Sequence, residues 1–227
     1  MASKTPRPLT RRRILAAGSG FIAGAGFALP RIARAALPIP DGNNLGFAVM
    51  RKGSQIGTHI LTFAPSDDGL VVKVGVDLMV KFGPIVLFRY THRATETWSG
   101  EQVVSIASET DDNGKKLTVK GALTADGFSV EATKLPPYVA PPSALPATHW
   151  NRRMLDGPFI NTQDGRLMRP TITPLGPSQI PTAGGTDITA EHFSMTGDAV
   201  LDTWYDSTWA GISFKGGDGS LIQYCRM

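Results

Sequence analysis

Residues 70–82, LVVKVGVDLMVKF, decide the fold class of this chain. Apolar residues stand at every second position of the stretch, with mostly polar or small residues between them: Leu70, Val72, Val74, Val76, Leu78, Val80 and Phe82. A period of two matches the pleat of a β-strand, in which alternate side chains point to opposite faces. The stretch therefore predicts one long strand with one buried face.

Turn sequences surround this strand at short intervals. Asn113-Gly114 separates two strand-like segments, and this pair favours a two-residue hairpin because both positions tolerate a positive φ. Ser66–Gly69, Lys52–Ser54 and Asp126-Gly127 are further turn signals. Since no helical crossover separates these segments, they predict an antiparallel meander of six or seven strands over residues 45–134.

Proline marks a change after this meander. Leu135–Pro146 contains five prolines, and because proline lacks an N–H and fixes φ, we expect an extended crossing loop there. Ala147–Leu155 is the best candidate for one short helix. Pro170–Pro181 is a second proline-rich stretch, and strands resume over residues 187–225. The predicted fold is all-β, a meander curled into a half-barrel or barrel, with a two-sheet sandwich as the main alternative.

The N-terminal segment resembles a twin-arginine export signal. Arg11 and Arg12 precede an apolar run, Ile14–Leu29, that is too short and too glycine-rich for a stable membrane span. A small-x-small motif predicts cleavage between Ala35 and Ala36. We therefore expect contact with the Tat translocase and a signal peptidase during export, and a periplasmic location. An ordinary secretory signal with a chance arginine pair is the alternative.

Removal of residues 1–35 would change the charge of the chain. This segment holds seven of the 23 basic residues and none of the 19 acidic ones, so residues 36–227 keep 16 basic residues and a net charge of −3. The pI of about 9.3 therefore reflects the signal, and no nucleic-acid partner is expected. Residues 36–227 are long enough for a single domain. Cys225 is the only cysteine, so no intrachain disulfide is possible.

Few residues carry a recognisable chemistry. The sequence contains no Gly-x-Ser-x-Gly, His-Glu-x-x-His or Cys-x-x-Cys motif and no phosphate-binding glycine loop, so no cofactor is expected. No two histidines have the spacing of metal ligands. Strand parity places His59, His92 and Glu96 on inward faces. Because an unpaired buried polar group costs about 1–3 kcal/mol, these side chains either form a satisfied network or line a wet cavity.

Two aromatic and polar clusters lie in the second half of the chain, around Trp150 and around Trp204. Tryptophan suits core corners and binding sites equally well. Asp202 and Asp206 share one strand face but lie about 13 Å apart, which is too far for a shared proton. The candidate ligand-binding residues are His59, Tyr90, His92, Glu96, Trp98, His149, Trp150, Asn151, Trp204 and Tyr205.

Short motifs occur in a fixed order along the chain: Gly53-x-x-Ile56-Gly57-x-His59, Tyr90, Glu96-x-Trp98-x-Gly100, Asp112-Asn113-Gly114, His149-Trp150-Asn151 and Asp202-x-Trp204-Tyr205-Asp206. This series is similar to a family of exported bacterial proteins of about this length that is defined only as a domain of unknown function. The resemblance covers almost the whole mature chain and implies export and a fold, without an activity. The curled meander also looks like the half-barrels of periplasmic lipoprotein carriers, which bind acyl chains in an apolar concavity.

Three functions remain open from the sequence. The first is a non-catalytic module that binds an apolar or amphipathic, lipid-like small molecule in a barrel-like cavity. The second is an envelope accessory or structural protein that acts through its surface. The third is a hydrolase in which His92 or His59 acts as the base and Glu96 orients it. The absence of catalytic motifs favours the first two.

Overall fold

The computed structural model describes residues 37–67 and 69–227, and these form an all-β fold. The export signal predicted at the N-terminus lies outside the described residues. The alternating stretch that predicted a long strand is present as β3 (Gly69–Phe82). Every second side chain of β3 is buried from Leu70 to Val76, as the alternation predicted.

The far end of β3 departs from that prediction. Strand β2 (Ser54–Ser66) pairs with β3 only as far as Leu78, so residues 79–82 pair with β4 (Ile85–Ser99) alone. Phe82 is 75% exposed. The expectation of one buried face along the whole stretch is therefore wrong at this end, because the β3–β4 hairpin projects beyond the core.

Two meanders supply the strands of the main sheet. The first runs through β1 (Asn44–Arg51), β2, β3, β4, β5 (Gln102–Asp112), β6 (Lys115–Thr124), β7 (Gly127–Ala132) and β8 (Leu135–Ala140). The second runs through β12 (Thr171–Pro181), β13 (Asp187–Thr196), β14 (Leu201–Tyr205), β15 (Trp209–Lys215) and β16 (Leu221–Arg226). Seven strands, β1 to β7, occupy the region where six or seven were predicted.

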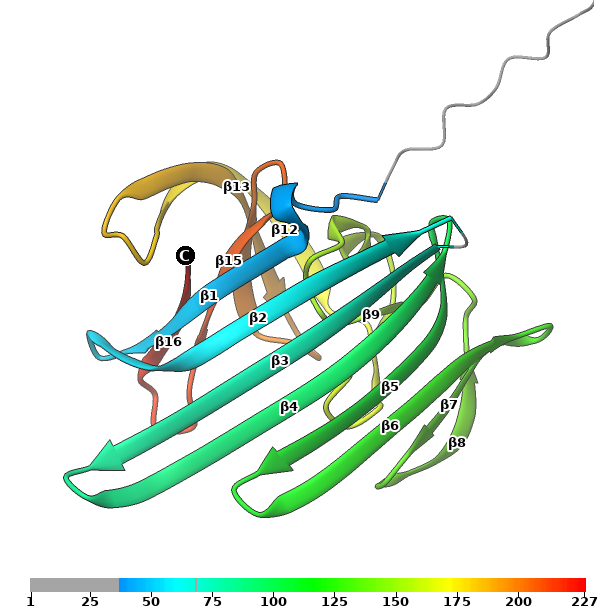
Figure 1. The fold of residues 1–227 in the computed structure, drawn as a ribbon, viewed down its shortest axis with the longest axis horizontal. Helices are drawn as coiled ribbons and strands as arrows, with labels where there is room; N and C mark the ends of the chain where they lie inside the picture. Colours follow the sequence, from blue (N-terminus) through cyan, green and yellow to red (C-terminus); the bar gives the residue numbers. More distant parts are fainter. Residues whose placement is uncertain (1–36, 68) are drawn as a thin grey trace, which may run out of the picture. The chain divides into compact units, whose positions relative to one another are not determined.

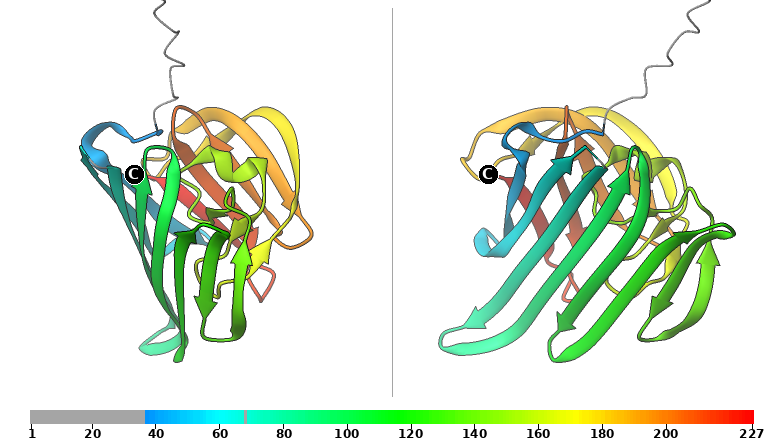
Figure 2. Two further views of the ribbon diagram at one scale, coloured as in Figure 1. Left: turned by 90° about the vertical axis from the view of Figure 1, so that its right-hand side faces the viewer. Right: turned by 45° about the vertical axis from the view of Figure 1, so that its right-hand side comes forward.

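Pairing of β1 with β16 joins the two meanders into one antiparallel sheet of 13 strands, ordered β12-β13-β14-β15-β16-β1-β2-β3-β4-β5-β6-β7-β8. The sheet curls so that β12–β16 lie behind β1–β4 (Figure 1) and face them across the interior (Figure 2). The two edge strands, β12 and β8, do not pair with each other. The sheet is therefore an open, barrel-like structure rather than a closed barrel or a two-sheet sandwich.

Both proline-rich stretches contain edge strands. Residues 135–140, predicted as part of a crossing loop, form β8, and most of the second proline stretch forms β12. The loop prediction is wrong for residues 135–140 because an edge strand pairs on one side only and does not need every N–H for a ladder. Proline in these positions also limits pairing with another chain.

Residues 141–170, here called the insert, pack against the inner face of the sheet. They contain a small sheet of β9 (Leu145–Pro146), β10 (Phe159–Ile160) and β11 (Leu167–Met168). The helix predicted in this region is present only as a 3-10 helix, η2 (Arg152–Asp156), because His149, with a φ of 66°, and Asn151, with an extended backbone, are not helical. The Asn151 side chain caps η2. A further 3-10 helix, η1 (Asp41–Asn43), precedes β1.

The insert completes the core at one end of the curled sheet. Trp150, Met154 and Ile160 of the insert are buried, and the Trp150 ring forms T-shaped contacts with Phe63 and Trp98 at centroid distances of 5.3 and 5.1 Å. The core is thus dense where the insert lies, and the described residues do not fill the interior beyond it.

The part of the chain that the structure describes contains no helix with the length and apolar character needed to cross a membrane.

Candidate functional site

A cavity of about 870 Å³ occupies the unfilled part of the interior. The inner faces of the sheet supply most of its apolar wall: Ile56, Val74, Val76, Leu78, Val80, Ile212, Phe214 and Ile222. Residues 147–149 and 162–163 of the insert form another side. The alternation that predicted buried strand faces therefore produces a concave apolar surface, because the curled sheet has too few inward side chains to fill its own interior.

Four of the ten candidate residues line this cavity, namely His59, Tyr90, His92 and His149. The other six do not line it: Glu96, Trp98, Trp150, Asn151, Trp204 and Tyr205. Parity along β2 and β4 places His59, Tyr90 and His92 on the inner face, whereas His149 comes from the insert, where strand parity does not apply.

His59 is a buried polar side chain surrounded by aromatic rings. It is 6% exposed, and neither ring nitrogen has a hydrogen-bond partner among the described residues. The rings of Trp209 and Tyr224 meet it edge-on at 5.3 and 5.5 Å. Burial, followed by the proximity of His149 and His92, lowers the pKa of His59 to about 3. The imidazole is therefore neutral at physiological pH and offers one donor and one acceptor.

His149 also points an unpaired nitrogen into the interior. Its Nδ1 is buried and has no hydrogen-bond partner in the part of the chain that the structure describes, and its ring stacks on Trp209 at a centroid distance of 5.2 Å. The residue has a φ of 66°, an uncommon backbone conformation for a residue other than glycine. The Tyr205 hydroxyl donates to its carbonyl at 2.9 Å and helps hold that backbone. Burial lowers the pKa of His149 to about 4, so this ring too is neutral.

His92, in contrast, is fully partnered. Its Nδ1 lies 2.9 Å from the Thr110 hydroxyl and its Nε2 lies 3.2 Å from the Thr162 hydroxyl. Because the Thr110 hydroxyl donates to the Gln163 carbonyl at 3.4 Å, its oxygen is left to accept, which assigns the ring proton to Nδ1. Burial, followed by the charge of Arg93, lowers the pKa of His92 to about 4. His92 therefore anchors the insert to β4 and β5.

Glu96 belongs to the core rather than to the cavity. Its Oε2 accepts the indole N–H of Trp98 at 2.8 Å and that of Trp150 at 3.0 Å. Burial raises the pKa of Glu96 to about 7, although hydrogen bonding with Thr148, Trp150 and Trp98 opposes the rise. No hydrogen bond between described residues joins Glu96 to His59 or His92, so the base and orienting pair of the hydrolase hypothesis is not formed.

The remaining candidates hold the structure in place. Asn151 Oδ1 accepts from the Arg153 N–H at 3.1 Å and caps η2. The Trp204 indole donates to Ser178 at 2.8 Å and stacks on His192 at 4.2 Å. These contacts give Trp204 and the Asn151 side-chain carbonyl oxygen a structural role, whereas the Asn151 Nδ2 is buried without a hydrogen-bond partner among the described residues.

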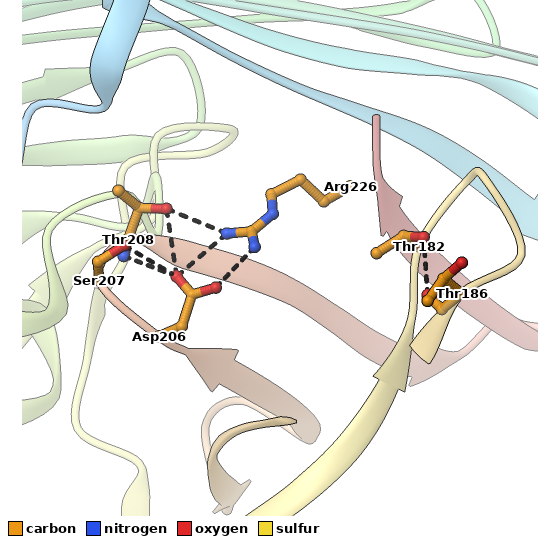
Figure 3. Close-up of polar contacts among 6 residues, drawn as sticks. All are labelled: Thr182, Thr186, Asp206, Ser207, Thr208 and Arg226. Atoms are coloured by element: carbon orange, nitrogen blue, oxygen red, sulfur yellow. Dashed lines mark hydrogen bonds and ion pairs between the residues drawn. The ribbon is translucent and has the colours of Figure 1, made fainter. Parts of the chain in front are cut away.

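The two aspartates of the last cluster serve different partners. Asp202 Oδ1 lies 3.0 Å from His192 Nε2. Asp206 instead forms a bidentate ion pair with Arg226, which Figure 3 shows. Their separate roles agree with the expectation that they form no carboxylate pair. In the described part of the chain, no group of three or more His, Cys, Asp or Glu side chains is placed to hold a metal ion.

Comparison with known proteins gives a family and a fold. Residues 47–227 match the model of a domain of unknown function, DUF6134. The chain belongs to the DUF6134 family. No curated protein matches it significantly. A solved structure, a beta-barrel-like protein of the domain of unknown function DUF1849 from Brucella abortus, is similar with a TM-score of 0.55 and 9% identity, over 81% of this chain and 95% of that chain. At this identity the likeness shows the fold alone.

Several cavity residues of this DUF6134 chain were missed from the sequence. Tyr224 and Phe214 line the wall, and Arg51 lies at the cavity with its guanidinium 2.5 Å from Asp218. Arg166 is also there, 2.8 Å from Asp164. Alternation within residues 221–225 could have pointed to Tyr224. The arginines follow from long-range pairing of β1 with β16 and of the insert with the sheet, which no local pattern reveals.

Proposed function

We propose that this protein is an exported, periplasmic, non-catalytic module that binds an apolar or amphipathic small molecule in its cavity. One observation carries the proposal: the cavity of about 870 Å³ has apolar strand faces as walls and two neutral histidines with unpaired nitrogens. Ligand pockets of about 300–1,000 Å³ with a few placed polar groups are typical of small-molecule sites. The barrel-like fold is consistent with such a module.

The polar groups favour a ligand with an uncharged head group. His59 and His149 are neutral, and burial raises the pKa of Tyr90 and Tyr224, so their hydroxyls stay protonated. Arg51 is already paired with an aspartate. A hydroxyl, amide or carbonyl group would satisfy the unpaired nitrogens without the cost of burying a charge. The ligand we expect is therefore lipid-like, with an apolar body and a neutral polar end.

A cavity-filling variant tests this proposal. Leu78→Trp places an indole on the cavity wall. We expect it to weaken binding of the methyl ester of 11-dansylaminoundecanoic acid, a probe with a neutral polar end, at least about tenfold, which corresponds to 1.4 kcal/mol. The matched control is Leu175→Trp, which adds the same bulk at a side chain on β12 that is 54% exposed and outside the cavity.

Fluorescence titration with the dansyl probe measures both affinities, and native mass spectrometry of the protein from its own compartment identifies the natural ligand. Equal binding by the wild type and Leu78→Trp would contradict the cavity as the site. A wild type that binds no apolar probe and carries no extra mass would leave the surface-acting alternative.

The export route has its own test. Replacing Arg11 and Arg12 together by lysine should stop twin-arginine export, because that route reads the arginine pair itself. We expect the full-length precursor to accumulate in the cytoplasm, whereas the control Arg13→Lys is exported and begins at Ala36. Cell fractionation with mass measurement of the N-terminus checks both. Normal export of the double variant would show an ordinary secretory signal.

A further inference from the structure

The tip of the β3–β4 hairpin is an exposed apolar surface that the binding function does not explain. Four of its side chains are exposed to solvent, by 75% for Phe82, 59% for Ile85, 42% for Val86 and 58% for Leu87. Exposure of consecutive residues on both faces means that neither face of the tip packs against the chain. Single exposed apolar residues are common, but a continuous run of them usually marks an interaction site.

The geometry of the tip suits the polar–apolar interface of a bilayer. Phe82 and Ile85 pair across the turn, whereas residues 79–82 pair with no second strand and keep backbone groups that water or polar lipid head groups can satisfy. The turn is Gly83-Pro84, and proline has no N–H to leave unpaired. In Figure 1 this turn is the lower left extremity of the sheet, beyond the ends of β1 and β2.

The charges beside the tip favour an anionic surface. Lys81 and Arg89 flank the apolar residues, both are exposed, and within the described residues neither forms an ion pair. The adjacent β5–β6 hairpin carries both signs, with Asp111 and Asp112 against Lys115 and Lys116. Basic side chains around an apolar tip match the anionic lipid head groups at a membrane interface.

The apolar tip is continuous with the cavity. Val80 and Phe88, at the base of the projecting hairpin, line the cavity, and so does Leu87, one of the exposed residues of the tip. Val200, which is 73% exposed on the β13–β14 loop, lines it as well. A stable protein partner normally covers about 800 Å² around a buried centre. A narrow projecting hairpin offers no such flat area, whereas it can enter a bilayer interface.

We propose that the β3–β4 hairpin tip docks this protein on a lipid bilayer surface, with Phe82, Ile85 and Leu87 in the interface and Lys81 and Arg89 against anionic head groups. Docking would place the mouth of the cavity at the lipid surface. The proposal stands on the exposed tip and does not depend on what the cavity binds.

The test uses residues 36–227, which form a compact unit of their own, because the apolar N-terminal segment would itself bind lipid. Cosedimentation with phosphatidylcholine vesicles containing about 30 mol% phosphatidylglycerol measures binding. We expect Phe82→Ser combined with Ile85→Ser to weaken it at least about tenfold. The matched control, Val139→Ser with Leu175→Ser, removes two side chains that are 55% and 54% exposed on the edge strands and should bind as the wild type does.

Two further readouts complete the test. Omitting phosphatidylglycerol should weaken binding about fivefold for each basic residue engaged, and a Phe82→Trp variant should show a blue shift of emission with vesicles. Equal binding by the tip variant and its control, or no vesicle binding by the wild type, overturns the proposal. Self-association that the tip variant abolishes, without vesicle binding, overturns it too and makes the tip an interface between copies.

The dansyl probe separates this proposal from the binding function. We expect the tip variant to keep its affinity for the probe, since Phe82 and Ile85 do not line the cavity. Failure of vesicle binding with intact probe binding would refute docking alone.

Discussion

Acidification from about pH 6.5 to pH 4.5 is expected to lower the free energy of unfolding by up to about 2.7 kcal/mol per pH unit. Burial lowers the pKa of His59, His92 and His149 to about 3, 4 and 4, whereas an unfolded histidine titrates near 6.5. Between these values the unfolded chain binds protons that the folded protein does not. The stability that these rings contribute is therefore present above about pH 6.5 and is lost as the pH falls.

Glu96 changes the free energy of unfolding in the opposite direction, because its carboxyl group stabilises the folded protein as the pH falls. Burial raises its pKa to about 7, so near pH 5.5 the folded protein holds a proton that an unfolded carboxyl, with a pKa of about 4.3, has released. Three histidines and one carboxyl leave a net uptake of about two protons on unfolding, and each contributes about 1.4 kcal/mol per pH unit. This balance sets the expected slope.

Urea unfolding followed by circular dichroism between pH 7 and pH 4.5 measures this slope. His59→Phe removes one titrating ring from an aromatic nest and should lower the slope by about one proton, while Glu96→Gln should raise it by about one. Because the ring nitrogens of His59 are unpaired, His59→Phe should cost no stability at pH 7 yet weaken probe binding. A stability that rises on acidification would contradict the assignment.

The fold class followed from local patterns, and the order of the strands in the sheet did not. Alternation in β3 and the turn at Asn113-Gly114 predicted the meander, because pleat and turn chemistry act within a few residues. The joining of β1 to β16 and the edge positions of β8 and β12 depend on contacts between distant segments. For this reason the prolines of residues 135–140 were interpreted as a loop, although an edge strand tolerates them.

The candidate site, like the fold, was predicted correctly where local strand parity decides and incorrectly where long-range packing decides. Strand parity correctly placed His59 and His92 on the inner face and at the cavity. Parity cannot show which inward residues have partners, and so it grouped Glu96 with them. The partners of Glu96 include Trp150, 54 residues away on the insert, and that contact exists only because the insert folds back over the sheet. Long-range packing, rather than any local signal, separates the core residues from the cavity residues.

Trp150→Ala is expected to lower the free energy of unfolding by about 3–5 kcal/mol and to abolish high-affinity probe binding. Trp150 is 1% exposed, packs edge-on against Phe63 and Trp98, and donates to Glu96. Its loss leaves a cavity in the core and removes one of the two indole donors of a buried carboxyl. Since Trp150 directly follows His149, it also holds the part of the insert that lines the cavity.

Trp204→Ala is the matched control. Trp204 is 8% exposed, packs in a separate cluster with Ile180 and Ala210, and does not line the cavity. We expect this variant to lose stability but to keep its affinity for the dansyl probe below its unfolding transition. Urea unfolding and fluorescence titration of both variants separate the two effects. If Trp150→Ala binds the probe as tightly as Trp204→Ala does, the insert is not needed to form the cavity wall, and the strand faces alone make the site.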